Sequence, residues 1–397
     1  MNSITSLESI LQAHRHCFGH APSLVVRAPG RINLIGEHTD YNEGFVLPAA
    51  IDKAVWLAVS PRSDEALHFQ ALDFQDSFSG TIRHLLKTEQ HWPNYLLGTF
   101  DELLKDGHTL GGVNATLGGN IPTGAGLSSS AAVESGILFA LNELFGLGLD
   151  RPALARLAQR AENNFVGMNC GIMDMFASLM GRANHAIKLD CRSLEAEYFP
   201  IRMPDHALVL CDSGVKHQLV DSAYNTRRSE CEEGVTALST IFPNIRSLRN
   251  VTLAMLLSEK KRLRDGVFQR CKFVIEENTR VISACNALKN NDLELFGHLL
   301  YQSHEGLQHD YEVTCPETDF LVDETRSEAD VLGARQMGGG FGGCTLNLVR
   351  RDAVVGFQEK IQVSYLKHWG KNLKFYPVEI TDGVEMVYST PLIREEI

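Results

Sequence analysis

Residues 30–42 bring acidic, basic and imidazole side chains together within one short stretch of chain. Arg31, Glu37, His38 and Asp40 can together donate hydrogen bonds to several hydroxyls and accept hydrogen bonds from them. A buried sugar or polyol requires such a set, because each hydroxyl left without a partner costs free energy. A turn whose charges are solvated, or paired with one another, would show the same composition, and composition alone leans towards that turn. The segment is a candidate sugar site, with the solvated turn as the alternative.

Residues 122–132 place glycines and three serines directly before an apolar run with helical spacing. Glycines let the backbone approach an anion closely, and the start of a helix offers free N–H groups and the positive end of the dipole. Serine hydroxyls can bond phosphate oxygens or ligate Mg²⁺. The segment has neither the lysine of the P-loop nor the spacing of the dinucleotide-binding fingerprint. It predicts an anion site, with a glycine-rich turn before a Ser-capped helix as an equal alternative.

Residues 333–344 contain five glycines within six positions and lead directly into an apolar strand. Such a run implies unusual φ values or a very close approach of the backbone. A flexible loop is the alternative, but it would anchor the following strand poorly. Other residues are unremarkable by themselves. Asp174 precedes a helical run and could be its N-cap, Glu162 fits a solvated helix face, and Tyr224 fits a partly buried aromatic residue.

The elements that must position these segments are strands and helices in mixed order. Apolar patterns predict strands at 24–28, 46–60, 113–117, 206–211, 345–349 and 375–378, and helices at 92–105, 133–145, 150–165, 224–238 and 265–288. The order is not a strict alternation of strand and helix, so we expect an α+β fold. Between residues 185 and 205 the pattern of the sequence changes, because the helices predicted after this point are long and rich in charged residues. We therefore expect two domains, 1–200 and 201–397, with the third segment in the second.

Length and charge exclude several classes of protein. The chain has 397 residues and a net charge of −12, which weighs against nucleic-acid and anionic-membrane binding. No segment offers the roughly 18 uninterrupted apolar residues of a membrane span. Nine cysteines without a C-x-x-C pair indicate reduced thiols, a cytoplasmic location and no structural zinc.

Taken together and in this order, the three segments resemble those of the galactokinase family within the GHMP kinase superfamily. Residues 30–42 resemble the galactokinase signature, residues 122–132 the ATP-phosphate loop of the superfamily, and residues 333–344 its C-terminal motif. The similarity spans essentially the whole chain. It implies two α+β domains with the active site in the cleft between them. The implied reaction is ATP-dependent phosphorylation of the C1 hydroxyl of α-D-galactose.

Carried over position by position, the resemblance also implies roles for single residues. Asp174 matches the catalytic carboxylate, the base for the C1 hydroxyl, and Arg31 lies beside it. The sugar contacts would be Arg31, Glu37, His38, Asp40, Gly171, Asp174 and Tyr224. The ATP contacts would be Pro122, Gly124, Ala125, Gly126, Leu127, Ser128, Ser129 and Ser130. Mg²⁺ would lie near Ser130 and Glu162, with Asp174 as the alternative carboxylate. We further expect a monomer with no obligate protein partner.

The sequence departs from the family pattern at three places. Met175 replaces the usual Gln after the catalytic Asp, Glu43 replaces Gly, and Gln336–Met337 replace Met–Thr. Two alternatives follow: a related sugar 1-kinase, for example for N-acetylgalactosamine or arabinose, and a non-catalytic galactose and ATP sensor. The complete serine run at 128–130, with Arg31 and Asp174, favours catalysis. Trp92, Asn94 and Tyr95 are candidates for adenine contact by position, with a helix packed on the core as the alternative.

Overall fold

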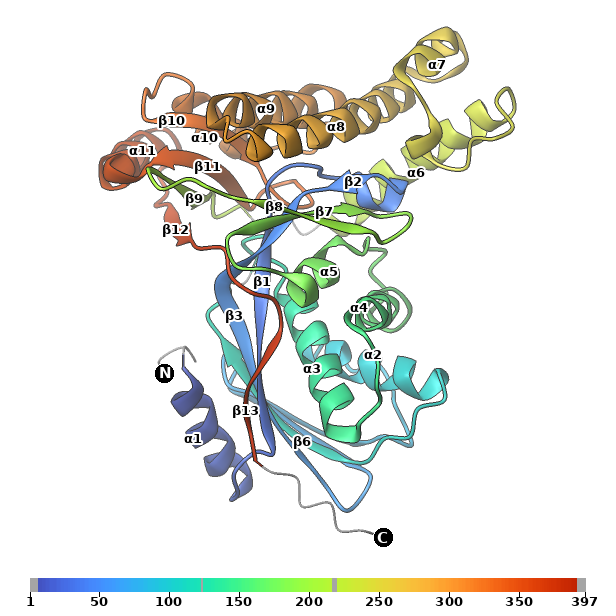
Figure 1. Ribbon diagram of the computed structural model, residues 1–397, viewed down its shortest axis with the longest axis vertical. Helices are drawn as coiled ribbons and strands as arrows, with labels where there is room; N and C mark the ends of the chain where they lie inside the picture. The colour runs from blue at the N-terminus through green and yellow to red at the C-terminus, as the bar shows by residue number, and fades with distance from the viewer. Residues whose placement is uncertain (1–5, 123, 216–219, 391–397) are drawn as a thin grey trace.

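A six-stranded sheet forms the centre of the first half of the molecule (Figure 1). The computed structural model describes residues 6–122, 124–215 and 220–390. The strand order is β13-β1-β3-β6-β4-β5, and only the β4–β6 pair is parallel. The strands are β1 Leu24–Asn33, β3 Pro48–Pro61, β4 Ala66–Ala71, β5 Asp76–Thr81, β6 Val113–Gly119 and β13 Glu385–Ser389. Strands β1 and β3 are buried along most of their length because helices cover both faces of the sheet.

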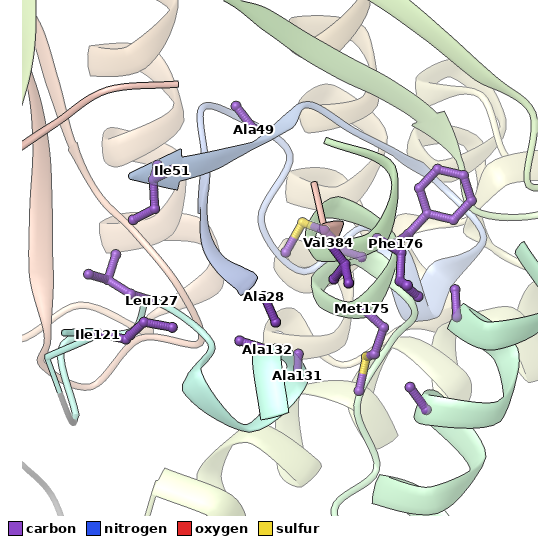
Figure 2. Packing of buried hydrophobic residues seen from close by; sticks show 14 of the residues in the cluster. Ala28, Ala49, Ile51, Ile121, Leu127, Ala131, Ala132, Met175, Phe176 and Val384 are labelled. Carbon is purple, nitrogen blue, oxygen red and sulfur yellow. The ribbon is translucent and has the colours of Figure 1, made fainter. Parts of the chain in front are cut away.

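Helix α1 lies on one face of this sheet, and the other four helices of this half lie on the opposite face (Figure 1). They are α1 Leu7–Phe18, α2 Trp92–Lys105, α3 Ser129–Phe145, α4 Arg151–Arg160 and α5 Met173–Met180. Helix α3 approaches the sheet closely at Gly136, where a Cβ would lie 2.8 Å from that of Ala28. Small residues such as Ala131 and Ala132 continue this contact in Figure 2. The middle of α3 thus packs against β1. Just before the helix, the carbonyl of Leu127 accepts from the N–H of Arg31 on β1 over 3.2 Å.

A four-stranded antiparallel sheet, β10-β11-β9-β12, forms the second half. Its strands are β9 His206–Asp212, β10 Val331–Gln336, β11 Cys344–Arg350 and β12 Lys374–Val378. The helices are α6 Val220–Ser239, α7 Leu253–Ser258, α8 Asp265–Lys289, α9 Leu293–Glu305, α10 Pro316–Thr325 and α11 Val354–Trp369. Alternate residues of β9 divide between two cores: Leu208 and Leu210 pack with α8 and α9, whereas Val209 packs with α11.

Smaller elements complete the fold. A three-stranded sheet contains β2 Phe45–Val46, β7 His185–Asp190 and β8 Ala196–Pro200. Short 3-10 helices span Asp40–Asn42, Leu248–Asn250, Lys260–Arg262 and Arg351–Ala353, and π-helices span Ala161–Val166 and Gly306–Tyr311. The α+β, two-domain prediction is confirmed. The boundary near residue 200 stays a prediction, but the last strand, β13, pairs with β1 in the first sheet.

The predicted strands and helices occur, with shifts at their ends. Strand β1 does not end at residue 28 as expected but continues to Asn33, so that Arg31 lies within the strand, and the strand expected at 46–60 is divided into β2 and β3. The helix expected to reach Phe165 ends at Arg160 and continues as the π-helix. Helix α5 begins at Met173 with Ile172 at the N-cap position, so the N-cap interpretation of Asp174 is wrong. Within the described residues, no helix has the length and hydropathy to cross a bilayer.

Candidate functional site

The two halves enclose a cavity of about 350 Å³, a size typical of small-molecule sites. All but one of the residues predicted from sequence to form the site line it: Arg31, Glu37, His38, Asp40, Pro122, Gly124, Gly126, Leu127, Ser128, Ser129, Ser130, Glu162, Gly171, Asp174 and Tyr224. The exception is Ala125, which is fully buried and is not among the lining residues. Three segments far apart in the sequence, with α5 and α6, therefore meet at one place.

Asp174 and Arg31 form the centre of the cavity. Arg31 Nε donates to Asp174 Oδ1 over 2.7 Å, and Nη2 donates to Oδ2 over 2.8 Å, which is a bidentate pair. The third nitrogen, Nη1, donates to the carbonyl of Gly126 over 2.6 Å. Burial opposes the charge of Arg31, but Asp174 together with Glu37 and Asp40 raises the pKa of the guanidinium. One arginine thus links the strand β1, the glycine-rich loop and the helix α5.

Residues 122–130, the phosphate loop, precede α3 with a backbone that glycine makes possible. Gly124 and Gly126 have φ angles of 77° and 76°, in the left-handed region. Ser128 occupies the N-cap position of α3, but its hydroxyl donates to Asp174 Oδ2 and makes no capping bond. The expectation of a Ser-capped helix is therefore wrong. The first turn of α3 keeps its N–H groups free of a side-chain cap, as a phosphate site requires. Thr123 lies outside the described residues.

Glu162 is 5% exposed, so the interpretation of this residue as part of a solvated helix face is wrong. Burial raises its pKa to about 7, and the charge of Asp174 adds to this shift, against a hydrogen bond from Cys170. The Cys170 thiol donates to Glu162 Oε2 over 3.3 Å, and the Ser130 hydroxyl faces the same carboxylate. Nearby, both carboxylate oxygens of the fully buried Glu134 lack a partner among the described residues.

This group of oxygen donors fits Mg²⁺. That ion is commonly held by one or two carboxylates together with phosphate oxygens and water. Ser130 and Glu162 line the cavity next to the phosphate loop. The charge of Asp174 raises the pKa of Glu162 and that of Arg31 lowers it, and Glu134 adds a further buried carboxyl group nearby. Within the same residues, no group of three or more His, Cys, Asp or Glu side chains could hold a metal by itself.

His38 is buried in a cluster of aromatic rings. Its Nδ1 lies 2.7 Å from the Tyr41 hydroxyl, which lies 2.8 Å from the hydroxyl of Tyr311. Burial lowers the pKa of His38 to about 3, helped by the charges of Arg227 and Arg335. The ring is therefore neutral. It lines the cavity, and the backbone of Gly339 hydrogen-bonds it.

Asp40, Gly171 and Tyr224 form another wall. Burial raises the pKa of Asp40 to about 7, and the charge of Asp174 adds to it. A Cβ on Gly171 would lie 1.7 Å from Asp40 Oδ2, so glycine at this position makes room for the carboxylate. The Tyr224 ring centroid lies 5.4 Å from that of His38, and a Cβ on Gly339 would lie 3.5 Å from the Tyr224 ring.

A second, more apolar pocket of about 220 Å³ continues from the first and shares Ser129 and Ser130 with it. Its apolar lining includes Phe74, Trp92, Tyr95, Ile121 and Val133. Asn94 does not contribute, because its amide bonds the backbone of Thr88. Two of the three residues suggested by position therefore line this pocket.

Sequence reasoning missed several residues of both pockets. Gly167, Met168, Asn169, Met173 and Asn225 line the first cavity, and Asp73 and Phe74 line the second. Gly167 has a φ of 95° and ends the π-helix, so a glycine at this position indicated the end of a helix in the sequence. The other residues have no such local signal, because their placement depends on long-range packing.

Met175, the departure next to Asp174, does not face the cavity. It is fully buried in the first core. Figure 2 shows it on α5 beside Phe176, within the cluster that includes Ala131 and Ala132. Gln336, at another of the three departures, is buried and bonds Thr318 and the carbonyl of Val313, which fixes the start of the third glycine segment.

Three family models match the chain. They are the galactokinase galactose-binding signature at residues 12–61, the GHMP kinase N-terminal domain at 94–182 and the GHMP kinase C-terminal domain at 285–365. The chain is 42% identical to a galactokinase of Roseiflexus sp. (strain RS-1), over 93% of this chain and 94% of that protein. It is 40% identical to a galactokinase of Thermotoga maritima, over 91% and 99%.

The chain is also similar in structure to solved proteins. A Lactococcus lactis galactokinase complexed with galactose has a TM-score of 0.92 and 33% identity, covering 96% of this chain and 99% of that one. A Methanococcus jannaschii mevalonate kinase has a TM-score of 0.62 at 16% identity, covering 91% and 99%, and shares the fold.

Proposed function

The chain belongs to the galactokinase family of the GHMP kinases, and on that premise we propose that it phosphorylates the C1 hydroxyl of α-D-galactose with ATP. The observation that carries this proposal is the Arg31–Asp174 pair. It lies where the polar segment 30–42 meets the phosphate loop in one cavity. The enzyme is thus a phosphotransferase with an alcohol as acceptor.

The sugar would bind among Glu37, His38, Asp40 and Tyr224, with Gly171 behind Asp40. These groups offer both carboxylate acceptors and a neutral imidazole nitrogen. Such a mixed set can satisfy hydroxyls in several directions, and a site built in this way rejects sugars that leave a buried polar group unpaired. The apolar faces of the sugar would meet the ring of Tyr224.

Asp174 would receive the hydrogen bond of the C1 hydroxyl. Each of its oxygens already accepts from Arg31, and Oδ2 also accepts from Ser128. These bonds fix the carboxylate in one orientation, so that it can align the hydroxyl and take up its proton as the new bond forms. Arg31, beside it, would stabilise negative charge on the transferred group. Phosphoryl transfer depends mainly on such positioning and charge stabilisation.

The phosphates of ATP would lie over the phosphate loop, at the first turn of α3, whose N–H groups have no side-chain cap. Ser130 and Glu162 would hold Mg²⁺, which when bound neutralises charge on the phosphate oxygens. The adenine would occupy the second pocket between Phe74, Trp92 and Tyr95. All of these groups belong to one chain, which supports a monomer as the active unit. The nine free cysteines support a reducing, cytosolic compartment.

An ADP-release assay with a panel of sugars tests the proposal. With Mg-ATP and galactose we expect turnover of about 1–100 per second, and ³¹P NMR of the product should place the phosphate on the anomeric carbon. N-Acetylgalactosamine and glucose should turn over poorly. Faster turnover with another sugar would move the specificity within the family. Binding of galactose without any turnover would replace the enzyme with a sensor.

A further inference from the structure

Glu37 is held by residues of the second half of the molecule. Arg335, at the end of β10, donates from Nη2 to Glu37 Oε1, and the backbone N–H of Gly338 donates to the same oxygen over 2.8 Å. Both side chains are buried, with 0% of Arg335 and 3% of Glu37 exposed. Almost 300 residues of chain separate the two partners.

Arg335 cannot itself touch a ligand in the cavity, because it is fully buried and does not line it, whereas Glu37 does. Its Nε and Nη1 have no hydrogen-bond partner among the described residues. The contact with Glu37 is therefore the only side-chain ion pair of this guanidinium in the described part of the chain. A buried ion pair is costly to form, and an apolar side chain on β10 would often be at least as stabilising. The stability of the fold therefore does not by itself explain why Arg335 and Glu37 are paired.

The contact orders the Glu37 carboxylate. Both donors from the described residues reach Oε1, so the carboxylate cannot rotate without breaking two charge-assisted bonds. Its Oε2 is left as the acceptor for a bound molecule. The backbone of the same turn is held separately, because Glu277 accepts from the N–H of Gly36 over 2.9 Å and Asn278 accepts from that of Phe45 over 2.7 Å. Loss of Arg335 would therefore leave the Glu37 carboxylate with the N–H of Gly338 as its one donor among the described residues, without releasing the turn.

We propose that Arg335 is a positioning residue for sugar recognition: it fixes Glu37 Oε1 from the second domain, so that Oε2 accepts from one particular hydroxyl of the hexose. The inference rests on the proposed function, because it takes galactose as the ligand of this cavity. It assigns to the third glycine segment a part in sugar selection through Arg335 and Gly338, at a distance from the phosphates.

A double-mutant cycle on sugar binding tests this inference. Galactose and its 2-, 3-, 4- and 6-deoxy analogues are titrated by calorimetry into the parent protein, Glu37→Gln, Arg335→Met and the double variant. We expect each single variant to weaken galactose binding about tenfold or more. Both should lose discrimination against the same single deoxy analogue and keep it against the others. The double variant should bind galactose no more weakly than Glu37→Gln alone. KM for ATP should change less than twofold, and Arg335→Lys should restore part of the affinity.

Arg27→Met is the matched control, since Arg27 is a largely buried arginine that faces Glu385 and the carbonyl of Asp52 outside the cavity. It should leave every discrimination ratio unchanged. Equal loss for all analogues in Arg335→Met, parent-like binding, or additive losses in the double variant would overturn the inference. If Arg335→Met does not fold, Arg335→Lys takes its place in the cycle. It should bind galactose more weakly than the parent and lose part of the discrimination against the same deoxy analogue as Glu37→Gln, and parent-like discrimination would overturn the inference. A parent protein that does not bind galactose would overturn the proposed function, and the inference with it.

Discussion

Asp174 accepts hydrogen bonds from two residues on different elements, Arg31 on β1 and Ser128 before α3. This convergence explains why an acidic residue in the first turn of an apolar helix points outwards into a cavity while its neighbour Met175 points into the core. One side of α5 thus lines the cavity, and the other side packs in the core. Substitution of the usual Gln by Met at 175 therefore changes packing and leaves the cavity wall intact.

The pKa of Asp40 leads to a prediction about stability. Burial, with the charge of Asp174, raises this pKa to about 7 in the ligand-free protein. A carboxyl whose pKa is raised by folding contributes stability that is fully present below about pH 4 and is lost as the pH rises through 7. Asp40→Asn should therefore raise the free energy of unfolding by roughly 2–4 kcal/mol at pH 8 and by little at pH 4, while it weakens galactose binding.

Urea unfolding of both proteins between pH 4 and 8 measures this difference. Asp323→Asn, at an exposed position on α10, is the control and should change stability by less than about 0.5 kcal/mol at any pH. A parent protein that is as stable as Asp40→Asn at pH 8 would show that the carboxylate is not destabilising.

At the scale of elements, we predict that the turn between β4 and β5 contributes to the binding of ATP. Phe74 is 56% exposed and forms part of the second pocket, which begins where the phosphate loop meets α3. A large exposed aromatic side chain beside a pocket is suited to stacking on a base. Stacking of a base on an aromatic ring contributes about 1–3 kcal/mol.

Phe74→Ala should accordingly raise KM for ATP by about tenfold, with KM for galactose changed less than twofold. Steady-state kinetics with each substrate varied in turn measures both constants. Leu86→Ala, at another exposed apolar position that is not among the lining residues of either pocket, should change neither. An unchanged KM for ATP in Phe74→Ala would remove adenine from this pocket.

At the scale of the whole molecule, the chain returns to its first sheet at the end. Strand β13 pairs with β1, the strand that leads to Arg31, and Val384 just before it is 1% exposed and packs in the first core (Figure 2). In the sequence, the second half of the molecule thus lies between β6 and β13, which both belong to the first sheet. The position of β1 therefore depends on residues from the far end of the sequence.

Val384→Asp should lower the free energy of unfolding by about 3 kcal/mol or more, because it buries an unpaired charge. Met386→Asp, on the exposed side of β13 (43% exposed), should cost less than about 1 kcal/mol. Chemical unfolding followed by tryptophan fluorescence measures both. Equal losses would mean that the burial of Val384 does not stabilise the sheet.

The sequence allowed prediction of some of the strands and helices and of most lining residues, because apolar periodicity and the three polar or glycine-rich segments are local signals. It did not predict β4, β5, β7, β8, β10 and β13, or α7, α9, α10 and α11. Contacts made by folding were out of reach. No local pattern distinguishes Glu162 from a solvated helix residue, or tells that Ser128 bonds Asp174 instead of capping α3. In the sequence, Arg335 has the pattern of an ordinary strand residue. Its contact with Glu37 forms only when β10 lies against the turn that carries Glu37.

The most direct test of the central claim is the comparison of turnover and galactose binding in Asp174→Asn. Amide replacement keeps the shape of the side chain but removes the negative charge and the proton acceptor. We predict that kcat falls by at least about a thousandfold, whereas the dissociation constant for galactose, measured by calorimetry, stays within a few fold of the parent value. Turnover within a few fold of the parent, with galactose still bound, would contradict the assignment of the reaction to the Arg31–Asp174 pair.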